Sequence, residues 1–222
     1  MQGQAAGRVA LVAGATGLVG RAVLAALLAD KRYREVHVVG RREPSLTHPK
    51  LHCHRVDFAH LGKLPEVDDV YVALGTTIKV AGNQQAFRAI DFDAVVAVAK
   101  AAKVSGATKL GVVSAMGANA KSSVFYNRVK GEMEDALSRL GYASLIVARP
   151  SILEGDRNSL QQPGRSGEGL ALMAMRLLRP LLPANYRAID AQRVAQALVQ
   201  AVQDATPGMR VLLSGELQTH AA

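Results

Sequence analysis

Short apolar runs rich in β-branched residues alternate along the chain with longer, alanine-rich stretches of helical periodicity. The short runs predict strands at residues 8–14, 35–40, 50–56, 69–75, 109–115, 143–150 and 209–215. Helices are expected at 18–30, 83–104, 124–140, 168–179 and 190–204. Several strands are apolar almost throughout, which is typical of a parallel sheet covered on both faces. The pattern therefore predicts an α/β fold with a doubly wound, mostly parallel sheet.

One change in composition interrupts this alternation. The polar stretch 154–169, rich in Gly, Pro, Ser and Gln, precedes the nearly all-apolar stretch 170–183. With 222 residues and 49% hydrophobic content, the chain suits a single domain spanning 1–222. We expect 151–190 to form a small loop-and-helix appendage over the active site. The alternative is a surface loop followed by a core helix or by the interface of a homodimer.

The composition limits the compartment and the partners. Cys53 is the only cysteine, which excludes an internal disulfide and favours a cytoplasmic location. The apolar stretch from Val9 to Leu28 contains evenly spaced glycines and Arg21, which argues against a signal peptide or a membrane span. A formal net charge of +9 favours an anionic partner, which could be a phosphorylated cofactor, nucleic acid or an anionic membrane surface. Nucleic acid is the weaker candidate, because aromatic residues make up 4% of the chain and there is no tryptophan.

The first predicted strand leads into a glycine-rich turn and then a helix. Three glycines are evenly spaced in the stretch "AGATGLVGRAVL". A dinucleotide-binding fingerprint requires this order, because glycines permit a tight turn and the close approach of a pyrophosphate to the backbone. The helix N-terminus would add free N–H groups and a partial positive charge. The alternative is a glycine turn without a ligand. The cofactor-binding residues expected here are Gly14, Ala15, Thr16, Gly17, Leu18, Val19 and Gly20.

The end of the second predicted strand indicates which nucleotide binds. Arg41 and Arg42 stand where an NAD enzyme would place an acid on the ribose 2′-hydroxyl. Guanidinium groups would instead bind a 2′-phosphate and stack on the adenine, so the expected cofactor is NADP(H). The alternatives are two arginines on a surface turn, or Glu43 reaching a ribose.

Two further positions fit the same ligand. Asp57 follows the third strand and would contact the adenine amino group, and "LGTT" at 74–77 places a glycine where backbone passes close to a cofactor. Each has an alternative: Asp57 would cap a helix begun by Phe58, and a threonine of the turn would cap the next segment. The cofactor-binding residues expected here are Asp57, Phe58, Leu74, Gly75 and Thr76.

Four histidines and Cys53 crowd into residues 48–60. His52 and His54 would share one face of a strand, as a pair of metal ligands would. An edge strand beside the adenine end lies away from the expected chemistry, so we expect a solvated strand and no metal site.

Tyr126 and Lys130 stand four residues apart in "FYNRVKGE", within a predicted helix. Residues at this spacing share a helix face whether or not they react, so spacing alone does not identify a catalytic pair. Proton exchange by a tyrosine at about pH 7 requires that the pKa of its hydroxyl group be lowered by about three units, which corresponds to roughly 4 kcal/mol. A lysine ammonium about 4 to 5 Å away supplies about that much at an effective dielectric constant of about 20. The pair can therefore exchange a proton beside a nicotinamide that carries the hydride.

Together these motifs resemble the short-chain dehydrogenase/reductase superfamily. More narrowly, "GATGLVG", "VVGRR", "VDF", "ALGTT", "VSAMGANAKSS", "FYNRVKGEMEDAL" and "ARPSIL" followed by "GDR" are similar to the atypical branch containing the Tat-interacting-protein-like oxidoreductases. The resemblance covers residues 8–160 and implies a Rossmann fold, bound NADP(H) and a Ser-Tyr-Lys centre. Arg149 in "ARP" and Arg157 in "GDR" match positions that line the cofactor cleft in relatives.

The resemblance also implies a role for each residue of the catalytic centre. Ser114 would orient a substrate oxygen, Tyr126 would exchange the proton, and Lys130 would bind the nicotinamide ribose and activate the tyrosine. The chain departs from the pattern at Ala115, where relatives often carry a second serine. Ser114 is therefore the only hydroxyl expected at that strand end.

The expected function is that of an NADPH-dependent reductase, or the reverse dehydrogenase, acting on a carbonyl or alcohol group of a small molecule. One alternative is an NADPH-binding regulatory protein that senses redox state and acts through a protein partner. Another is an epimerase or dehydratase of nucleotide sugars, although the chain after Pro150 leaves little room for a sugar-nucleotide domain. The sequence does not define the substrate.

Overall fold

A seven-stranded parallel sheet runs through the middle of the protein in the computed structural model, which describes residues 7–154 and 183–219. The strand order is β3-β2-β1-β4-β5-β6-β9. The strands are β1 (Arg8–Ala13), β2 (Tyr33–Gly40), β3 (Leu51–Arg55), β4 (Asp69–Val72), β5 (Lys109–Val113), β6 (Ser144–Arg149) and β9 (Gly208–Leu213). All the predicted strands and the doubly wound α/β fold are confirmed. The order reverses between β1 and β4, which is where sheets of this kind bind ligands.

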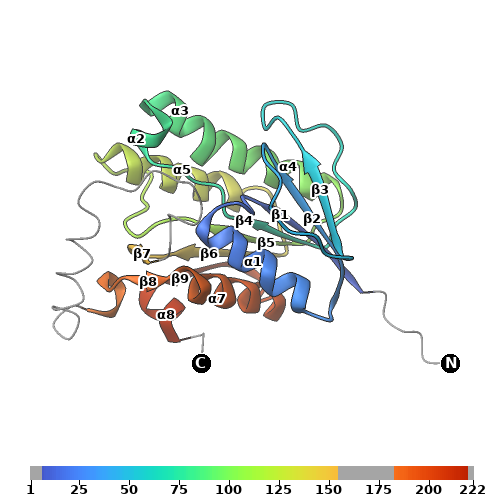
Figure 1. Cartoon of the computed structure of the whole chain (residues 1–222). Coiled ribbons are helices and arrows are strands. Elements are labelled where there is room, and N and C mark those ends of the chain that lie inside the picture. The colour runs from blue at the N-terminus through green and yellow to red at the C-terminus, as the bar shows by residue number, and fades with distance from the viewer. Residues whose placement is uncertain (1–6, 155–182, 220–222) are drawn as a thin grey trace.

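Helices cover both faces of the sheet, with α1 and α7 on one face and α3, α4 and α5 on the other (Figure 1). The helices are α1 (Leu18–Ala29), α2 (Ile78–Ala81), α3 (Gln84–Arg88), α4 (Val95–Val104), α5 (Phe125–Ser138), α7 (Ala191–Asp204) and α8 (Ser214–Thr219). A second, two-stranded parallel sheet pairs β7 (Leu153–Glu154) with β8 (Ile189–Asp190). The helices predicted at 18–30, 124–140 and 190–204 are confirmed, and the one at 168–179 lies outside the described residues.

The helix predicted at 83–104 is divided. Asn83 caps α3, since its side chain accepts the N–H of Ala86 at 2.8 Å. A π-helical segment, Ala89–Ala94, then separates α3 from α4. A π segment has wider hydrogen-bonded turns than an α-helix and is frequent at functional sites. The alanine-rich pattern of this stretch gives no sign of it, because both kinds of turn accept the same residues.

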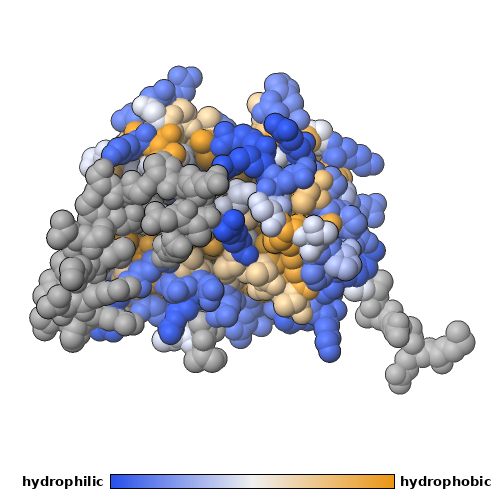
Figure 2. All heavy atoms as spheres, viewed as in Figure 1, coloured by the Kyte–Doolittle hydropathy of each residue, from blue (hydrophilic) through white to orange (hydrophobic). Residues whose placement is uncertain are grey.

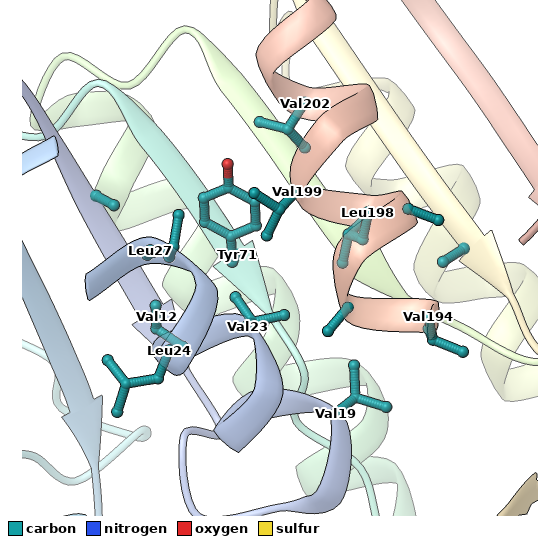
Figure 3. Close-up of a cluster of buried hydrophobic side chains, with 14 of the residues drawn as sticks. Val12, Val19, Val23, Leu24, Leu27, Tyr71, Val194, Leu198, Val199 and Val202 are labelled. Atoms are coloured by element: carbon teal, nitrogen blue, oxygen red, sulfur yellow. The ribbon is translucent and has the colours of Figure 1, made fainter. Parts of the chain in front are cut away.

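The core on one face of the sheet lies between α1 and α7. Figure 3 shows Tyr71 of β4 among side chains of both helices, including Val23 and Val199. Glycine brings α7 close to the sheet, because a Cβ at Gly111 of β5 would lie 2.7 Å from Cγ2 of Val202. This core is mainly apolar, and the hydroxyl groups of Tyr71 and Tyr33 within it hydrogen-bond to each other at 2.9 Å.

The core on the other face joins α4 and α5 to the same strands through Val95, Ala99, Met133 and Leu137. Here glycine brings a loop close to a helix. A Cβ at Gly131 of α5 would lie 2.1 Å from the backbone nitrogen of Ala120, and real Cβ contacts are never this short. The loop after β5 therefore passes directly over α5, next to Lys130.

We predict that Gly131→Ala lowers the free energy of unfolding by about 1–3 kcal/mol, because the added methyl group displaces the loop backbone at Ala120. Chemical denaturation followed by circular dichroism measures the change. Ser138→Ala on the exposed side of the same helix is the control and should change stability by less than about 0.5 kcal/mol. Equal stability of the two variants would contradict the packing described.

Candidate functional site

A cavity of about 530 Å³ opens where β1, β2 and β4 end. Its volume lies within the range of about 300–1,000 Å³ that is usual for small-molecule sites. Part of its wall comes from the π segment and α4, at Ala89, Ile90, Asp93, Ala94 and Ala97, which were not predicted. Eight residues predicted from the sequence line it: Gly14, Ala15, Thr16, Arg41, Arg42, Asp57, Phe58 and Leu74.

The glycine turn is built by two close backbone contacts. Gly14 has a φ of +91°, and a Cβ there would lie 2.5 Å from the carbonyl oxygen of Ala73. A Cβ at Gly20 would lie 2.0 Å from the carbonyl oxygen of Gly14. Gly17 donates its N–H to the same carbonyl at 3.0 Å. Side chains at Gly14 and Gly20 are thus excluded by the protein's own backbone.

The first turn of α1 has free N–H groups and directly follows Gly14, Ala15 and Thr16, which line the cavity. Gly17 is the N-cap, no side chain caps it, and the turn contains no acidic residue. The first hydrogen bond of the helix runs from the N–H of Arg21 to the oxygen of Gly17 at 2.9 Å. The preceding N–H groups, those of Leu18, Val19 and Gly20, remain available to an anion. The side chain of Val19 is buried in the core, so this residue could contact an anion only through its backbone N–H.

Arg41, Arg42 and Asp57 line the cavity, and all three are exposed residues. One oxygen of Asp57 accepts the N–H of Ala59 at 3.0 Å, and this backbone hydrogen bond lowers the pKa of the carboxyl group. Asp57 closes a turn, and no helix begins at Phe58. The alternative of a helix cap is therefore wrong at Asp57, while its contact with an adenine stays a prediction.

The turn at 74–77 connects the cavity to the catalytic candidates. Leu74 lines the cavity, and the N–H of Thr76 donates to Oδ2 of Asp91 at 2.9 Å. A Cβ at Gly75 would lie 3.4 Å from Oδ1 of Asp91 and 3.9 Å from Nζ of Lys130. Thr77 caps α2, since its hydroxyl accepts the N–H of Val80 at 3.1 Å, as the helix-cap alternative predicted.

Helix α5 carries Tyr126 and Lys130 one turn apart. Nζ of Lys130 lies 2.7 Å from Oδ1 of Asp91, and the two side chains are only 4% and 1% exposed. Tyr126 is half-buried, with its ring centroid 5.4 Å from that of Phe87 in α3. Lys130 is therefore part of a buried ion pair that the sequence did not predict.

Burial is the largest single influence on the pKa of Lys130 and lowers it, but the charge of Asp91 together with the other neighbouring groups gives a net upward shift. Tyr126 and Glu134 act in the same direction as Asp91. The ammonium group therefore keeps its proton and supplies a fixed positive charge one helical turn from Tyr126.

Ser114 follows β5 and lies in a second buried polar cluster. Its hydroxyl donates to Oε1 of Glu134, which also accepts Nε of Arg149 at 3.0 Å. The second oxygen of Glu134 pairs with Nη2 of Arg149, and these hydrogen bonds raise the pKa of the guanidinium. The hydroxyl proton of Ser114 is therefore bound within the protein, and its role toward a substrate stays a prediction. Arg157 lies outside the described residues.

Sequence reasoning missed both buried carboxylates, Asp91 and Glu134. A signal existed for Glu134, which stands four residues beyond Lys130 and so shares the helix face of Tyr126 and Lys130. Asp91 gave no signal, because the π segment that aims it at Lys130 is not visible in the pattern.

The histidines at the edge of the sheet contact one another. The ring of His37 stacks on those of His52 and His54, and its Nδ1 lies 2.9 Å from Nε2 of His54. Burial lowers the pKa of His37. His37 belongs to β2, whereas the edge strand β3 has no buried residue and exposes His52 and Arg55, as expected of a solvated strand. Within residues 7–154 and 183–219, no group of three or more His, Cys, Asp or Glu side chains is placed to hold a metal ion.

Hydrophilic residues dominate the outline of the face shown in Figure 2, and apolar residues reach the surface in smaller areas between them. In the part of the chain that the structure describes, each helix is too short or too polar to cross a membrane.

The sheet order, the glycine turn and the cavity at the switch point define a Rossmann-type nucleotide-binding fold. A family model described as "NAD dependent epimerase/dehydratase family" matches residues 10–179. The chain belongs to this family.

Relatives and solved structures agree with this assignment. "Protein FMP52-1, mitochondrial" of Scheffersomyces stipitis is 35% identical over 158 residues, which are 68% of this chain and 69% of that protein. "Protein FMP52, mitochondrial" of Candida albicans is 32% identical over 163 residues, 70% and 71% of the two chains.

A short chain dehydrogenase family protein from Francisella tularensis superposes with a TM-score of 0.68 at 15% identity, covering 96% of this chain and all of the other. MoeE5 in complex with UDP-glucose and NAD gives 0.69 at 17% identity, covering 91% and 74%. At these identities the likeness shows the fold.

The comparisons correct two expectations. The broad superfamily is confirmed, but the relatives found are FMP52 proteins and not Tat-interacting-protein-like ones. These relatives are named mitochondrial, so the prediction of a cytoplasmic location is wrong. A single cysteine excludes an internal disulfide, but it does not distinguish one reducing compartment from another.

We predict that Glu134→Ala lowers the free energy of unfolding by about 2–3 kcal/mol, because it leaves Arg149 without its carboxylate. The loss is smaller than the about 3–5 kcal/mol of a fully buried pair, since the Arg149 side chain is 25% exposed. Glu132, which is also on α5, forms a more exposed ion pair with Arg88 of α3. Glu132→Ala should therefore lower stability by less than about 1 kcal/mol. Urea denaturation compares them, and equal losses would refute the difference in burial.

Proposed function

We propose that the protein is an NADP(H)-dependent oxidoreductase that transfers a hydride between the nicotinamide and a carbonyl or alcohol group of a small molecule. The observation that carries the proposal is the connection of two parts of one site. The turn at 74–77 joins a cavity with a glycine turn and two arginines to the buried Asp91–Lys130 pair beside Tyr126. The family description names NAD, and the MoeE5 structure contains NAD, which supports a nicotinamide dinucleotide.

The residues present fit such a cofactor. Gly14 and Gly20 leave backbone where a Cβ would collide, and the free N–H groups of α1 would bind the pyrophosphate. Asp57 and Phe58 would face the adenine, and Lys130 would face the nicotinamide ribose. Arg149 and Arg157 are proposed to line the remainder of the cleft.

The nicotinamide supplies the hydride when it is bound. Tyr126 donates its hydroxyl proton to the substrate oxygen in the reductive direction and accepts a proton in the reverse direction. The fixed ammonium of Lys130 stabilises the negative charge that the tyrosine oxygen gains when it gives up this proton. Ser114 is proposed to orient the substrate oxygen. Its lone pairs can accept the hydroxyl group of an alcohol substrate, whereas donation to a carbonyl oxygen requires that its proton turn away from Glu134.

The single domain 1–222 and the appendage formed by 151–190 remain proposals, because most of that appendage lies outside the described residues. A homodimer is likewise a proposal. Nucleic acid stays the weaker partner, since the charged residues Arg41 and Arg42 line a cavity of small-molecule size.

We predict that wild-type protein binds NADPH at least about tenfold more tightly than NADH, because guanidinium groups form charge-assisted hydrogen bonds with a 2′-phosphate. Replacing Arg41 and Arg42 together by alanine should remove this preference, and it should weaken NADH binding much less than NADPH binding, because NADH loses only the stacking on its adenine. Fluorescence titration measures both affinities. Arg139→Ala, an exposed arginine after α5, should keep the preference. Equal affinity of the wild type for both nucleotides would overturn the NADP assignment.

We predict that Tyr126→Phe lowers turnover by about 10²–10⁴-fold, because the phenyl ring has no proton to donate. The affinity for NADPH should stay within about threefold, since only a hydroxyl is lost. Turnover is followed by NADPH absorbance on a panel of small carbonyl compounds. Tyr186→Phe changes an exposed tyrosine and should have no effect. Unchanged turnover in Tyr126→Phe would exclude this residue from the mechanism.

A second candidate function is that of a nucleotide-sugar epimerase or dehydratase. The family description favours it, as do the structures of MoeE5 with UDP-glucose and of a UDP-N-acetylglucosamine 4-epimerase, which has a TM-score of 0.69. Such activity would convert UDP-glucose without net oxidation of NAD(P)H, and NMR of the sugar would detect the product. The third alternative, a redox-sensing regulator, would bind NADPH tightly, transfer no hydride to the carbonyl panel and bind a protein partner only in one nucleotide state.

A further inference from the structure

Asp91 lies where three parts of the site meet. Its carboxylate comes from the π segment, accepts the N–H of Thr76 from the turn after β4, and contacts the ammonium of Lys130 from α5. The contacts use different oxygens, at 2.9 Å for Thr76 and 2.7 Å for Lys130. A single carboxylate therefore links the wall of the nucleotide cavity to the helix that carries Tyr126.

The pair contributes more to position than to stability. Desolvation of two buried charges offsets most of their attraction, and an apolar pair of similar volume is often at least as stabilising. A lysine side chain has four flexible carbon–carbon bonds, so the helix alone does not determine where its ammonium group lies. At Asp91 the ammonium has an ion-pair partner at a defined point, and its nitrogen lies 3.9 Å from where a Cβ at Gly75 would be.

The surrounding charges leave Asp91 as the group that balances Lys130. Tyr126 and Glu134 of α5 also raise the pKa of Lys130. However, Glu134 is already paired with Arg149 of β6 and accepts the hydroxyl of Ser114. Among the described residues, Asp91 is thus the carboxylate in ion-pair contact with Lys130.

We propose that Asp91 is a positioning residue of the Tyr126–Lys130 centre, which keeps the ammonium charged at a fixed place and ties it to the turn at Thr76. This proposal rests on the proposed catalytic role of that centre. The substitution Asp91→Asn separates the two contacts, because an amide oxygen can still accept the Thr76 N–H while the charge is lost. Asp91→Ala removes both contacts.

The first test titrates Lys130 itself and needs no substrate. Lysine labelled with ¹³C and ¹⁵N at its side-chain end is introduced into the full chain, and Lys130→Arg assigns the resonance. In the wild type, Lys130 should lose its proton at higher pH than the exposed lysines. In Asp91→Asn its midpoint should fall by at least about one pH unit, a tenfold change in proton affinity. Asp135→Asn, the same change on the exposed face of α5, should leave it in place.

An unchanged midpoint in Asp91→Asn would overturn the proposal. If Asp91→Asn does not fold, the wild-type titration decides alone, because a Lys130 that titrates with or below the exposed lysines would also overturn it.

The second test measures turnover against pH. In Asp91→Asn, kcat for carbonyl reduction should fall at least about tenfold, with NADPH affinity within about threefold of the wild type. The alkaline limb of the profile should move to lower pH, because loss of the negative charge favours release of the proton from Lys130. A merely structural defect would lower kcat without moving this limb. Asp91→Ala should in addition weaken NADPH binding, since the turn loses its acceptor at Thr76.

The two tests separate the inference from the function on which it rests. A limb that does not move in Asp91→Asn overturns the positioning role even if the wild type is active. If the wild type reduces no carbonyl but the midpoint of Lys130 falls in Asp91→Asn, the reductase proposal fails and the control of Lys130 by Asp91 is supported.

Discussion

The contact between Gly20 and the carbonyl oxygen of Gly14 determines where the first helix begins. A Cβ at Gly20 would lie 2.0 Å from that oxygen, so any other residue would push α1 away from the end of β1. Because of this contact, the uncapped first turn of α1 directly follows the turn that lines the cavity. The same position lets the apolar side of α1 pack against α7 over Tyr71. Ligand site and core thus depend on one backbone approach.

The opposite face of the sheet depends on paired charges as well as apolar contact. Helix α5 buries Lys130 against Asp91, and Glu134 against Arg149 and Ser114. An isolated buried charge is costly, so each of these groups needs its partner in place. The orientation of α5 is therefore tied to the π segment on one side and to β6 on the other. Tyr126 is held on the same helix, at its first turn.

The strands and the glycine turn could be predicted because each is a local property. Apolar β-branched runs specify buried strands, and glycines at even spacing after a strand specify a turn with close backbone contacts. Eight of the predicted cofactor residues line the cavity for this reason, since they stand at strand ends on one edge of the sheet. Three features could not be predicted, because they depend on packing between distant segments. They are the π segment, the cavity wall formed by Ala89, Ala94 and Ala97, and the two-stranded sheet of β7 and β8.

By itself, the sequence determined the parallel sheet, the glycine turn and the placing of Tyr126 and Lys130 on one helix face, because hydrophobic period and residue spacing are written along the chain. Only the tertiary structure decided which charges those residues meet. Asp91 is 39 residues from Lys130, and Arg149 ends β6 whereas Ser114 follows β5. The packing of helices and strands determines which charged groups meet, because an ion pair acts over a few ångströms in space regardless of distance along the chain.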